Sequence, residues 1–303
     1  MRVTVTGATG LIGAKLVAEL TGRGDEVTVL SRNPEKAGQA LGPGVEAVAW
    51  DPDTEAAPAG ALSGRDGVVH LAGESVAQRW NEQTKRAIRE SRVKGTAHLV
   101  QGLRAADPRP RVLVSSSAVG VYGPHGDERV DEDTPAGEGF LAEVCRQWEA
   151  GADTAAELGL RVVKVRTGVV LDQDGGALKT MLTPFKLGVG GPVAGGRQYM
   201  PWIHVEDIVG IYLRALDDES WSGAVNASAP EPVTNAEFSK ALGRALHRPA
   251  VAPVPAFALK ALYGEMSEIV IEGQRALPRR TRELGYEWRH PELDEALASA
   301  LGK

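Results

Sequence analysis

Three glycines near the start of the chain have the types and spacing of a phosphate-binding turn. Gly7, Gly10 and Gly13 lie between an apolar run at Val3–Val5 and a helix-compatible stretch. The first permits a tight turn, the second lets backbone approach a phosphate, and the third lets the helix pack close to the strand. The helix N-terminus offers free N–H groups to an anion. The sequence therefore predicts a site for a dinucleotide pyrophosphate, with three further candidate contacts at Thr9, Leu11 and Ile12.

The residues after the second apolar run indicate which dinucleotide fits. Ser31 lies 24 positions past Gly7, about where an NAD site carries the acidic residue that binds the ribose 2′-hydroxyl. Arg32 follows it, and a guanidinium matches a 2′-phosphate in geometry and charge. We therefore predict NADP(H) as the cofactor. The alternative interpretation is that Arg32 is a solvated surface residue before the turn at Asn33.

Further candidates follow the third and fourth strand-like runs. Trp50 and Asp51 could flank the adenine, or they could simply end a strand with a turn-forming Asp-Pro. Glu74 and Arg79 could reach a ribose or a phosphate, and a surface ion pair is the competing interpretation. Small or apolar residues that let the backbone approach the cofactor come just before them: Leu71, Ala72 and Gly73.

A serine run ends the fifth strand-like segment. Ser115 is predicted to lie beside the cofactor, and Ser117 to donate a hydrogen bond to a substrate carbonyl or hydroxyl as a catalytic residue. Strand-end capping is the competing interpretation, because serine often satisfies nearby backbone groups.

The elements that must position these residues alternate between strands and helices. Strand-like runs cover residues 3–5, 27–30, 45–50, 68–71, 111–115 and 161–165. Helical patterns cover residues 11–21, 81–105 and 140–158. This alternation predicts an α/β fold, a Rossmann-type doubly wound parallel sheet that binds ligands at the carboxyl ends of its strands.

The sequence pattern changes after about Arg166, where glycine- and proline-rich stretches become frequent. We predict an NADP-binding Rossmann domain over residues 1–166, with residues 205–227 returning to it. A glycine-rich stretch at 188–196 and several later prolines predict a smaller C-terminal α/β lobe on the substrate side, over residues 167–303. Apolar residues at helical spacing predict a packed helix over 292–301.

Composition narrows the function classes. The 303 residues have a net charge of −6 and no long basic block, which argues against nucleic acid as the main partner. Cys145 is the only cysteine, so neither an internal disulfide nor a cysteine-type zinc cluster can form. No leader pattern or membrane-length apolar run occurs. We therefore expect a cytoplasmic protein without a membrane partner, as a monomer or homodimer.

Several motifs together are similar to a known family. The glycine turn, the serine run with Tyr122-Gly123 behind it, and Pro201–Asp207 resemble an extended short-chain dehydrogenase/reductase. Other stretches resemble its sugar-nucleotide-epimerase-like branch, which has its own C-terminal domain: residues 71–74, 89–93, 166–171, 184–185, 190–192 and 196–198. The resemblance implies a Rossmann core, bound NADP(H), and an epimerase- or oxidoreductase-like activity on a small polar molecule such as a nucleotide sugar.

The resemblance fails at the residues that perform the superfamily's chemistry. That chemistry uses a tyrosine acid/base and a lysine four positions later on one helix face. Aligning the helix on Glu149 puts Leu141 and Cys145 in those places, and no Tyr-x-x-x-Lys occurs anywhere in the chain. Conceivable substitutes are Tyr122, Glu143, Tyr199 and His204. Two hypotheses remain open: an enzyme with an unusual base, and a non-catalytic NADP(H)-binding sensor or scaffold.

Overall fold

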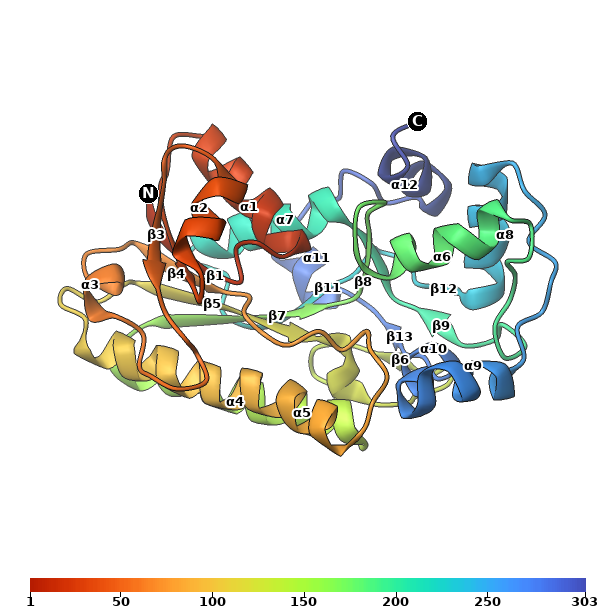
Figure 1. Ribbon diagram of the computed structural model, residues 1–303, viewed down its shortest axis with the longest axis horizontal. Coiled ribbons are helices and arrows are strands. Elements are labelled where there is room, and N and C mark those ends of the chain that lie inside the picture. Colours follow the sequence, from red (N-terminus) through yellow and green to blue (C-terminus); the bar gives the residue numbers. More distant parts are fainter.

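A seven-stranded parallel sheet forms the centre of the molecule in the computed structural model, which describes residues 1–303 (Figure 1). Across the sheet the strands run in the order β11-β7-β5-β4-β1-β2-β3. Their bounds are β1 (Arg2–Thr6), β2 (Glu26–Ser31), β3 (Val45–Ala49), β4 (Gly67–His70), β5 (Val112–Ala118), β7 (Arg161–Thr167) and β11 (Gly223–Ala227). This order, reversing its direction at β1, confirms the predicted Rossmann-type fold.

Helices cover both faces of the sheet, with α1, α2 and α7 above it and α4 and α5 below it in Figure 1. They are α1 (Leu11–Gly22), α2 (Pro34–Leu41), α7 (Val205–Asp217), α4 (Glu82–Ala105) and α5 (Phe140–Asp153), with the short α3 (Ala59–Leu62) packed on α4. Valine-rich strands buried on both faces suit this arrangement. Their side chains form one apolar cluster with α1 and α7 and a second with α4 and the end of α5.

The second lobe lies at the right of Figure 1, beyond the carboxyl end of β7. Its own core gathers Trp202 and Phe238 with apolar residues of three helices. The lobe contains β8 (Val169–Leu171), α6 (Gly176–Lys186), β9 (Tyr199–Met200), β10 (Trp202–His204), β12 (Val233–Thr234), α8 (Asn235–Leu246), α9 (Ala256–Tyr263), η3 (Gly264–Ser267), α10 (Glu268–Ile271) and α12 (Leu293–Ala300). Four short elements remain: η1 (Val119–Tyr122), which packs against α5; β6 (Arg129–Val130) and β13 (Arg275–Ala276), which pair with each other; and α11 (Arg279–Glu283), which packs against β11.

The six predicted strands all occur, while one predicted helix is shorter than expected. Helix α5 ends at Asp153, and a 3₁₀ segment, η2 (Thr154–Leu158), continues it. The seventh strand, β11, has no counterpart among the predicted strands. It follows a long excursion through the second lobe and consists of only five residues.

The chain crosses between the two lobes more than once. Helix α7 packs against α1, and β11 pairs in parallel with β7, so residues 205–227 lie with the Rossmann sheet. Near the C-terminus, Tyr286 and Trp288 pack against the same core. Asp207 is fully buried at the start of α7, and its carboxylate accepts hydrogen bonds from the N–H groups of Arg289 (2.7 Å) and His290 (3.1 Å).

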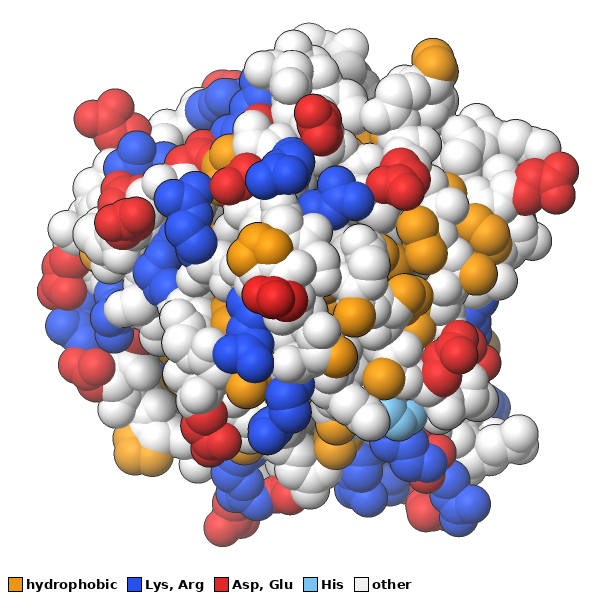
Figure 2. Space-filling model, turned by 90° about the vertical axis from the view of Figure 1, so that its left-hand side faces the viewer, with side chains coloured by type: hydrophobic (Ala, Val, Ile, Leu, Met, Phe, Trp, Pro, Cys, Tyr) orange, Lys and Arg blue, Asp and Glu red, His pale blue; other side chains and the backbone are white.

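The surface shows no segregation of charge on the face drawn in Figure 2, where basic and acidic side chains are interspersed. A basic surface for nucleic acid would need lysines and arginines gathered without acidic residues, whereas acidic side chains lie among the basic ones on that face. No helix combines the length and apolarity needed to cross a membrane.

Candidate functional site

A cavity of about 290 Å³ opens at the carboxyl ends of β1, β2 and β4, where the strand order reverses. Ten of the predicted cofactor residues line it: Gly7, Thr9, Gly10, Ser31, Arg32, Trp50, Leu71, Ala72, Gly73 and Glu74. Six further residues complete the lining: Ala8, Leu30, Ala37, Pro52, Asp53 and Ser91. Open α/β sheets bind their ligands at this position.

The glycine turn requires glycine at its first and third positions. Gly7 has φ +67°, and a Cβ there would lie 2.6 Å from the backbone carbon of Leu71. A Cβ on Gly13 would lie 2.3 Å from the carbonyl oxygen of Gly7, so α1 packs directly on the turn. No side chain caps the N-terminus of α1 at Gly10, and its first turn carries no acidic residue. Its free N–H groups are therefore open to an anion in the cavity.

A buried hydrogen-bond chain positions the wall of the cavity after β4. The Thr6 hydroxyl oxygen accepts the N–H groups of Leu71 and Ala72, each at 3.2 Å, and lies 2.7 Å from Nδ1 of His70. Nε2 of His70 lies 3.2 Å from the hydroxyl of Thr96. Burial, with a smaller contribution from the charge of Arg92, lowers the pKa of His70 to about 4. A neutral His70 therefore links the sheet, the loop and α4.

Two neighbouring residues of α4 hold the far end of that loop. The hydroxyl of Ser91 accepts the N–H of Glu74 at 2.9 Å, and Nη1 of Arg92 donates to the carbonyl of Glu74 at 2.9 Å. Neither residue was predicted to shape the site. The signal was present, because Ser91-Arg92 falls in one of the stretches that carry the family resemblance.

The adenosine side of the cavity is built around the turn after β2. The Ser31 hydroxyl accepts the N–H of Asn33 at 3.2 Å, and Asn33 in turn caps α2. Arg32 is exposed, and its guanidinium makes no hydrogen bond or ion pair with the protein. A carboxylate of Asp53 also lines the cavity, opposite in charge to Arg32. Nε1 of Trp50 donates to a backbone carbonyl at 3.0 Å, which fixes the ring in the wall.

The other six predicted cofactor residues do not line the cavity: Leu11, Ile12, Gly13, Asp51, Arg79 and Ser115. Asp51 accepts the N–H of Asp53 in a local turn. Arg79 donates instead to the carbonyl of Ala261 in α9, at 3.2 Å. Ser115 is buried, and its hydroxyl donates to the backbone carbonyl of Ser116.

Ser117, the predicted catalytic residue, lies outside the lining of the cavity, in a buried hydrogen-bond network. Its side chain is only 2% exposed, and the hydroxyl donates to Glu149 at 2.7 Å. Glu149 forms a buried bidentate pair with Arg166, at 2.8 and 3.0 Å. Arg166 also donates to the hydroxyl of Tyr122, which donates to Asn226 at 2.8 Å. Ser117 therefore belongs to a buried hydrogen-bond network, and its catalytic role stays a prediction.

The conceivable substitutes for the missing tyrosine are also committed elsewhere. Burial raises the pKa of Tyr122 to about 12, so its phenol is not tuned as a base near neutral pH. Glu143 pairs with Arg146 on the same helix. The ring of Tyr199 lies under the guanidinium of Arg275, 4.8 Å from ring centroid to Cζ.

The two positions aligned with the family's tyrosine and lysine are apolar or buried. The side chain of Leu141 packs against Gly120. Burial raises the pKa of Cys145 to about 11, so its thiol stays protonated and uncharged. Neither side chain can supply the proton or the positive charge of the usual pair.

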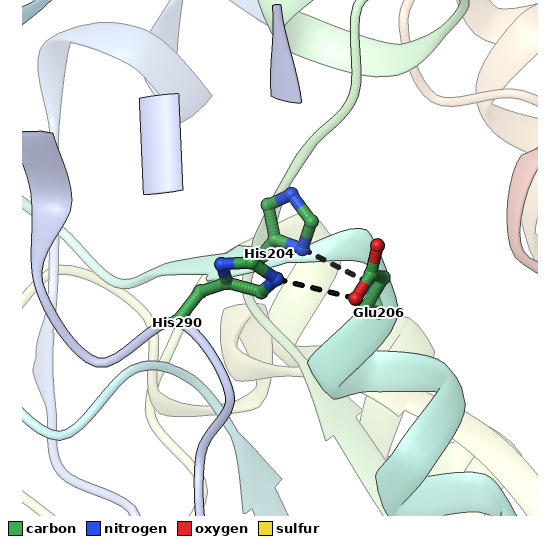
Figure 3. Close-up of side chains that lie close together, drawn as sticks. All are labelled: His204, Glu206 and His290. Carbon is green, nitrogen blue, oxygen red and sulfur yellow. Dashed lines mark hydrogen bonds and ion pairs between the residues drawn. The ribbon is translucent and has the colours of Figure 1, made fainter. Parts of the chain in front are cut away.

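His204 lies in a cluster with Glu206 and His290 (Figure 3). Nδ1 of His204 accepts the N–H of Glu206 at 3.2 Å and so caps α7. The ring of His290 lies 3.8 Å from that of His204, and its Nε2 lies 3.2 Å from the Glu206 carboxylate. Burial lowers the pKa of His290, but hydrogen bonds to Glu295 and Glu206 outweigh it and hold the pKa above its usual value. The cluster therefore ties the C-terminal segment to α7.

Comparison with known proteins covers nearly the whole chain. The sequence model of the NAD dependent epimerase/dehydratase family matches residues 3–227, and that of a domain of unknown function, DUF1731, matches residues 254–300. The Arabidopsis thaliana protein named "Epimerase family protein SDR39U1 homolog, chloroplastic" is 41% identical, over 99% of this chain and 87% of that protein.

Two solved structures share both the fold and more than a third of the sequence. The human epimerase family protein SDR39U1, crystallised with NADPH, has a TM-score of 0.88 and 38% identity, covering 100% of this chain and 99% of that one. A nucleoside-diphosphate sugar epimerase from Corynebacterium glutamicum has a TM-score of 0.80 and 36% identity, covering 100% of this chain and 58% of that one. With the glycine turn and the sheet order, these matches show that the chain belongs to the NAD-dependent epimerase/dehydratase family.

Proposed function

We propose that the cavity at the strand ends binds NADP(H). The carrying observation is that one cavity joins the uncapped N-terminus of α1 at Gly7 and Gly10 to the unpaired guanidinium of Arg32. The first is suited to a pyrophosphate, and the second to the 2′-phosphate that distinguishes NADP from NAD. The human relative that was crystallised with NADPH supports the same assignment.

The cofactor assignment is tested at Arg32. In the Arg32→Glu variant a carboxylate replaces the cation, so NADPH affinity should fall far more than NADH affinity. The dissociation constants of both cofactors are measured by titration of the purified protein. Arg86→Glu serves as a matched control, because Arg86 is an exposed arginine of α4 that forms no ion pair and does not line the cavity. Equal affinity of the wild type for NADPH and NADH would refute the assignment.

We further propose that the protein is an oxidoreductase or epimerase that acts on a small polar substrate. When bound, the cofactor exchanges a hydride with that substrate. The C-terminal lobe supports this proposal, because it stands beyond the strand ends where a substrate would meet the cofactor. The name of the Corynebacterium relative favours nucleotide sugars among the possible substrates. Incubation with NADP(H) and a panel of nucleotide sugars and carbonyl compounds tests it, and no turnover despite tight NADPH binding would contradict it.

A second candidate function is NADP(H) binding without turnover, as a sensor or scaffold. It is favoured by Leu141 and Cys145, which cannot replace the usual pair, and by the hydrogen bonds that commit Ser117 and Tyr122. The Ser117→Ala variant separates the two candidates. Unchanged cofactor affinity together with no hydride exchange in either protein supports the sensor, whereas hydride exchange by the wild type refutes it.

A further inference from the structure

Arg92 is a half-buried cation that forms no salt bridge, although the carboxylate of Glu74 lies within electrostatic reach. It extends from α4, and its Nη1 donates to the carbonyls of Glu74 (2.9 Å) and Ile88 (3.1 Å). It forms no ion pair, and its Nε and Nη2 groups make no hydrogen bond within the protein. Desolvation of a charge is costly unless a partner compensates it. The unused donors are therefore available to a ligand.

The surroundings of Arg92 fix its guanidinium in one place. Its Cζ lies 5.0 Å from the centroid of the Trp148 ring, in the geometry of a cation–π contact. On the other side it faces Gly73 so closely that a Cβ there would lie 3.2 Å from Cζ. The guanidinium is thus held between α5 and the loop that lines the cavity. Such pre-organisation reduces the entropy lost when a ligand binds.

The fold indicates which part of the cofactor would reach Arg92. Arg32 and Trp50 line the cavity on the side of β2 and β3, which is the adenosine side. Gly7 and Gly10 at its centre suit the pyrophosphate. The remaining half of the dinucleotide must therefore extend toward β4 and β5. Gly73 lines the cavity on that side, and the guanidinium of Arg92 lies against Gly73, just beyond the lining residues.

The same region lacks the cation that the family resemblance leads one to expect. Cys145 stands in the place of the lysine, and its thiol lies within electrostatic reach of Arg92. Arg92 of α4 thus supplies a cation in this part of the site, where the family's lysine would lie on α5.

We propose that Arg92 is a cofactor-binding residue that holds the nicotinamide nucleotide half of NADP(H) through its free Nε and Nη2 donors. The oxygen-rich ribose and its phosphate are the chemical groups that a guanidinium fork binds best. This inference rests on the proposed binding of NADP(H) in the cavity.

The test compares two ligands that differ by that half. NADPH contains it, whereas 2′,5′-ADP carries only the adenosine half with its 2′-phosphate. Arg92→Met should raise the dissociation constant for NADPH about tenfold or more, as expected for a lost charge-assisted hydrogen bond. The constant for 2′,5′-ADP should change less than about twofold. Both constants are measured by calorimetric titration.

Two further variants separate ligand binding from support of the loop. Ser91→Ala removes the other side-chain hydrogen bond to the backbone of Glu74 without changing charge, so it reports the effect of loosening the loop. Arg92→Lys keeps the charge and most of the stem, and provides the test if Arg92→Met does not fold. We expect it to weaken NADPH selectively by a smaller factor.

The outcomes distinguish this inference from the proposed function. If the wild type binds neither ligand, NADP(H) binding itself is wrong. If the wild type binds both but Arg92→Met weakens them equally, or no more than Ser91→Ala does, the inference about Arg92 is wrong. Selective loss of NADPH supports it.

Discussion

Replacing Gly13 by alanine tests how closely α1 must pack on the glycine turn. The added Cβ would lie 2.3 Å from the Gly7 carbonyl oxygen and 2.8 Å from Cα of Ala8, which is 1.1 and 0.6 Å short of an ordinary 3.4 Å contact. Both atoms belong to the backbone, so the helix itself must move. Overpacking of this kind costs about 1–3 kcal/mol, and the higher helix propensity of alanine returns about 1 kcal/mol at most. The free energy of unfolding should therefore fall, by up to about 2 kcal/mol with the full propensity offset.

Gly22→Ala is the matched control, because it makes the same change in the same helix. A Cβ on Gly22 would meet nothing within 4 Å. This variant should keep or raise the free energy of unfolding, by up to about 1 kcal/mol. Urea denaturation measures the free energy of unfolding of both variants. Titration with NADPH measures their cofactor affinity, which depends on where the N-terminus of α1 lies. NADPH should bind more weakly to Gly13→Ala and normally to Gly22→Ala. A Gly13→Ala protein as stable as the wild type, with unchanged NADPH affinity, would refute the reasoning.

Three further perturbations address the buried polar groups. The pKa of His70 in the folded protein, about 4, lies below its ordinary 6.5, so protonation favours the unfolded chain. The free energy of unfolding should therefore fall by ~2 kcal/mol from pH 7 to pH 5. A His70→Gln variant should lack this part of the pH dependence in urea titrations. Glu149→Gln leaves Arg166 buried without a counter-charge and should cost about 3–5 kcal/mol, whereas Ser117→Ala should cost only about 1 kcal/mol; equal losses in denaturation experiments would contradict this ranking. Asp207→Ala leaves the partly buried N–H groups of Arg289 and His290 without their acceptor, at a cost of up to about 1–3 kcal/mol each. This variant should accelerate amide hydrogen exchange in the C-terminal segment that Asp207 holds.

The sheet was predictable because its strands are buried on both faces. The valine-rich runs at β1, β2 and β4 have apolar side chains on both faces of the strand, as in parallel sheets with helices packed on both sides. Strand β11 was missed, since Gly-Ala-Val-Asn-Ala carries no such run and pairs with β7 only after the chain has left and re-entered the domain. A strand whose formation depends on pairing with a segment far away in the sequence cannot be predicted from its local residue pattern.

The site residues could be predicted where the backbone conformation requires a particular residue type. They could not be predicted where their place depends on which face of a strand the side chain occupies. Gly7 and Gly10 are required by the turn, so their place in the cavity followed from sequence. The place of Ser117 did not follow in this way, because successive residues of a strand point to opposite faces of the sheet. Ser115 and Ser117 both point into the protein, and sequence does not say which face the cavity occupies. Arg92 was missed because its position depends on the packing of α4 against the loop after β4.

The contacts that the C-terminal residues Tyr286, Arg289 and His290 make with the Rossmann domain affect how the chain folds during synthesis. Tyr286 packs into the Rossmann core, and the N–H groups of Arg289 and His290 satisfy the buried carboxylate of Asp207. The N-terminal two thirds of the chain therefore cannot complete their core while they emerge from the ribosome. They must wait, with apolar surface uncovered, until almost the last residue has been added. Truncations that remove only the last two dozen residues should consequently yield aggregated protein, even though the glycine turn and the cavity residues are all present.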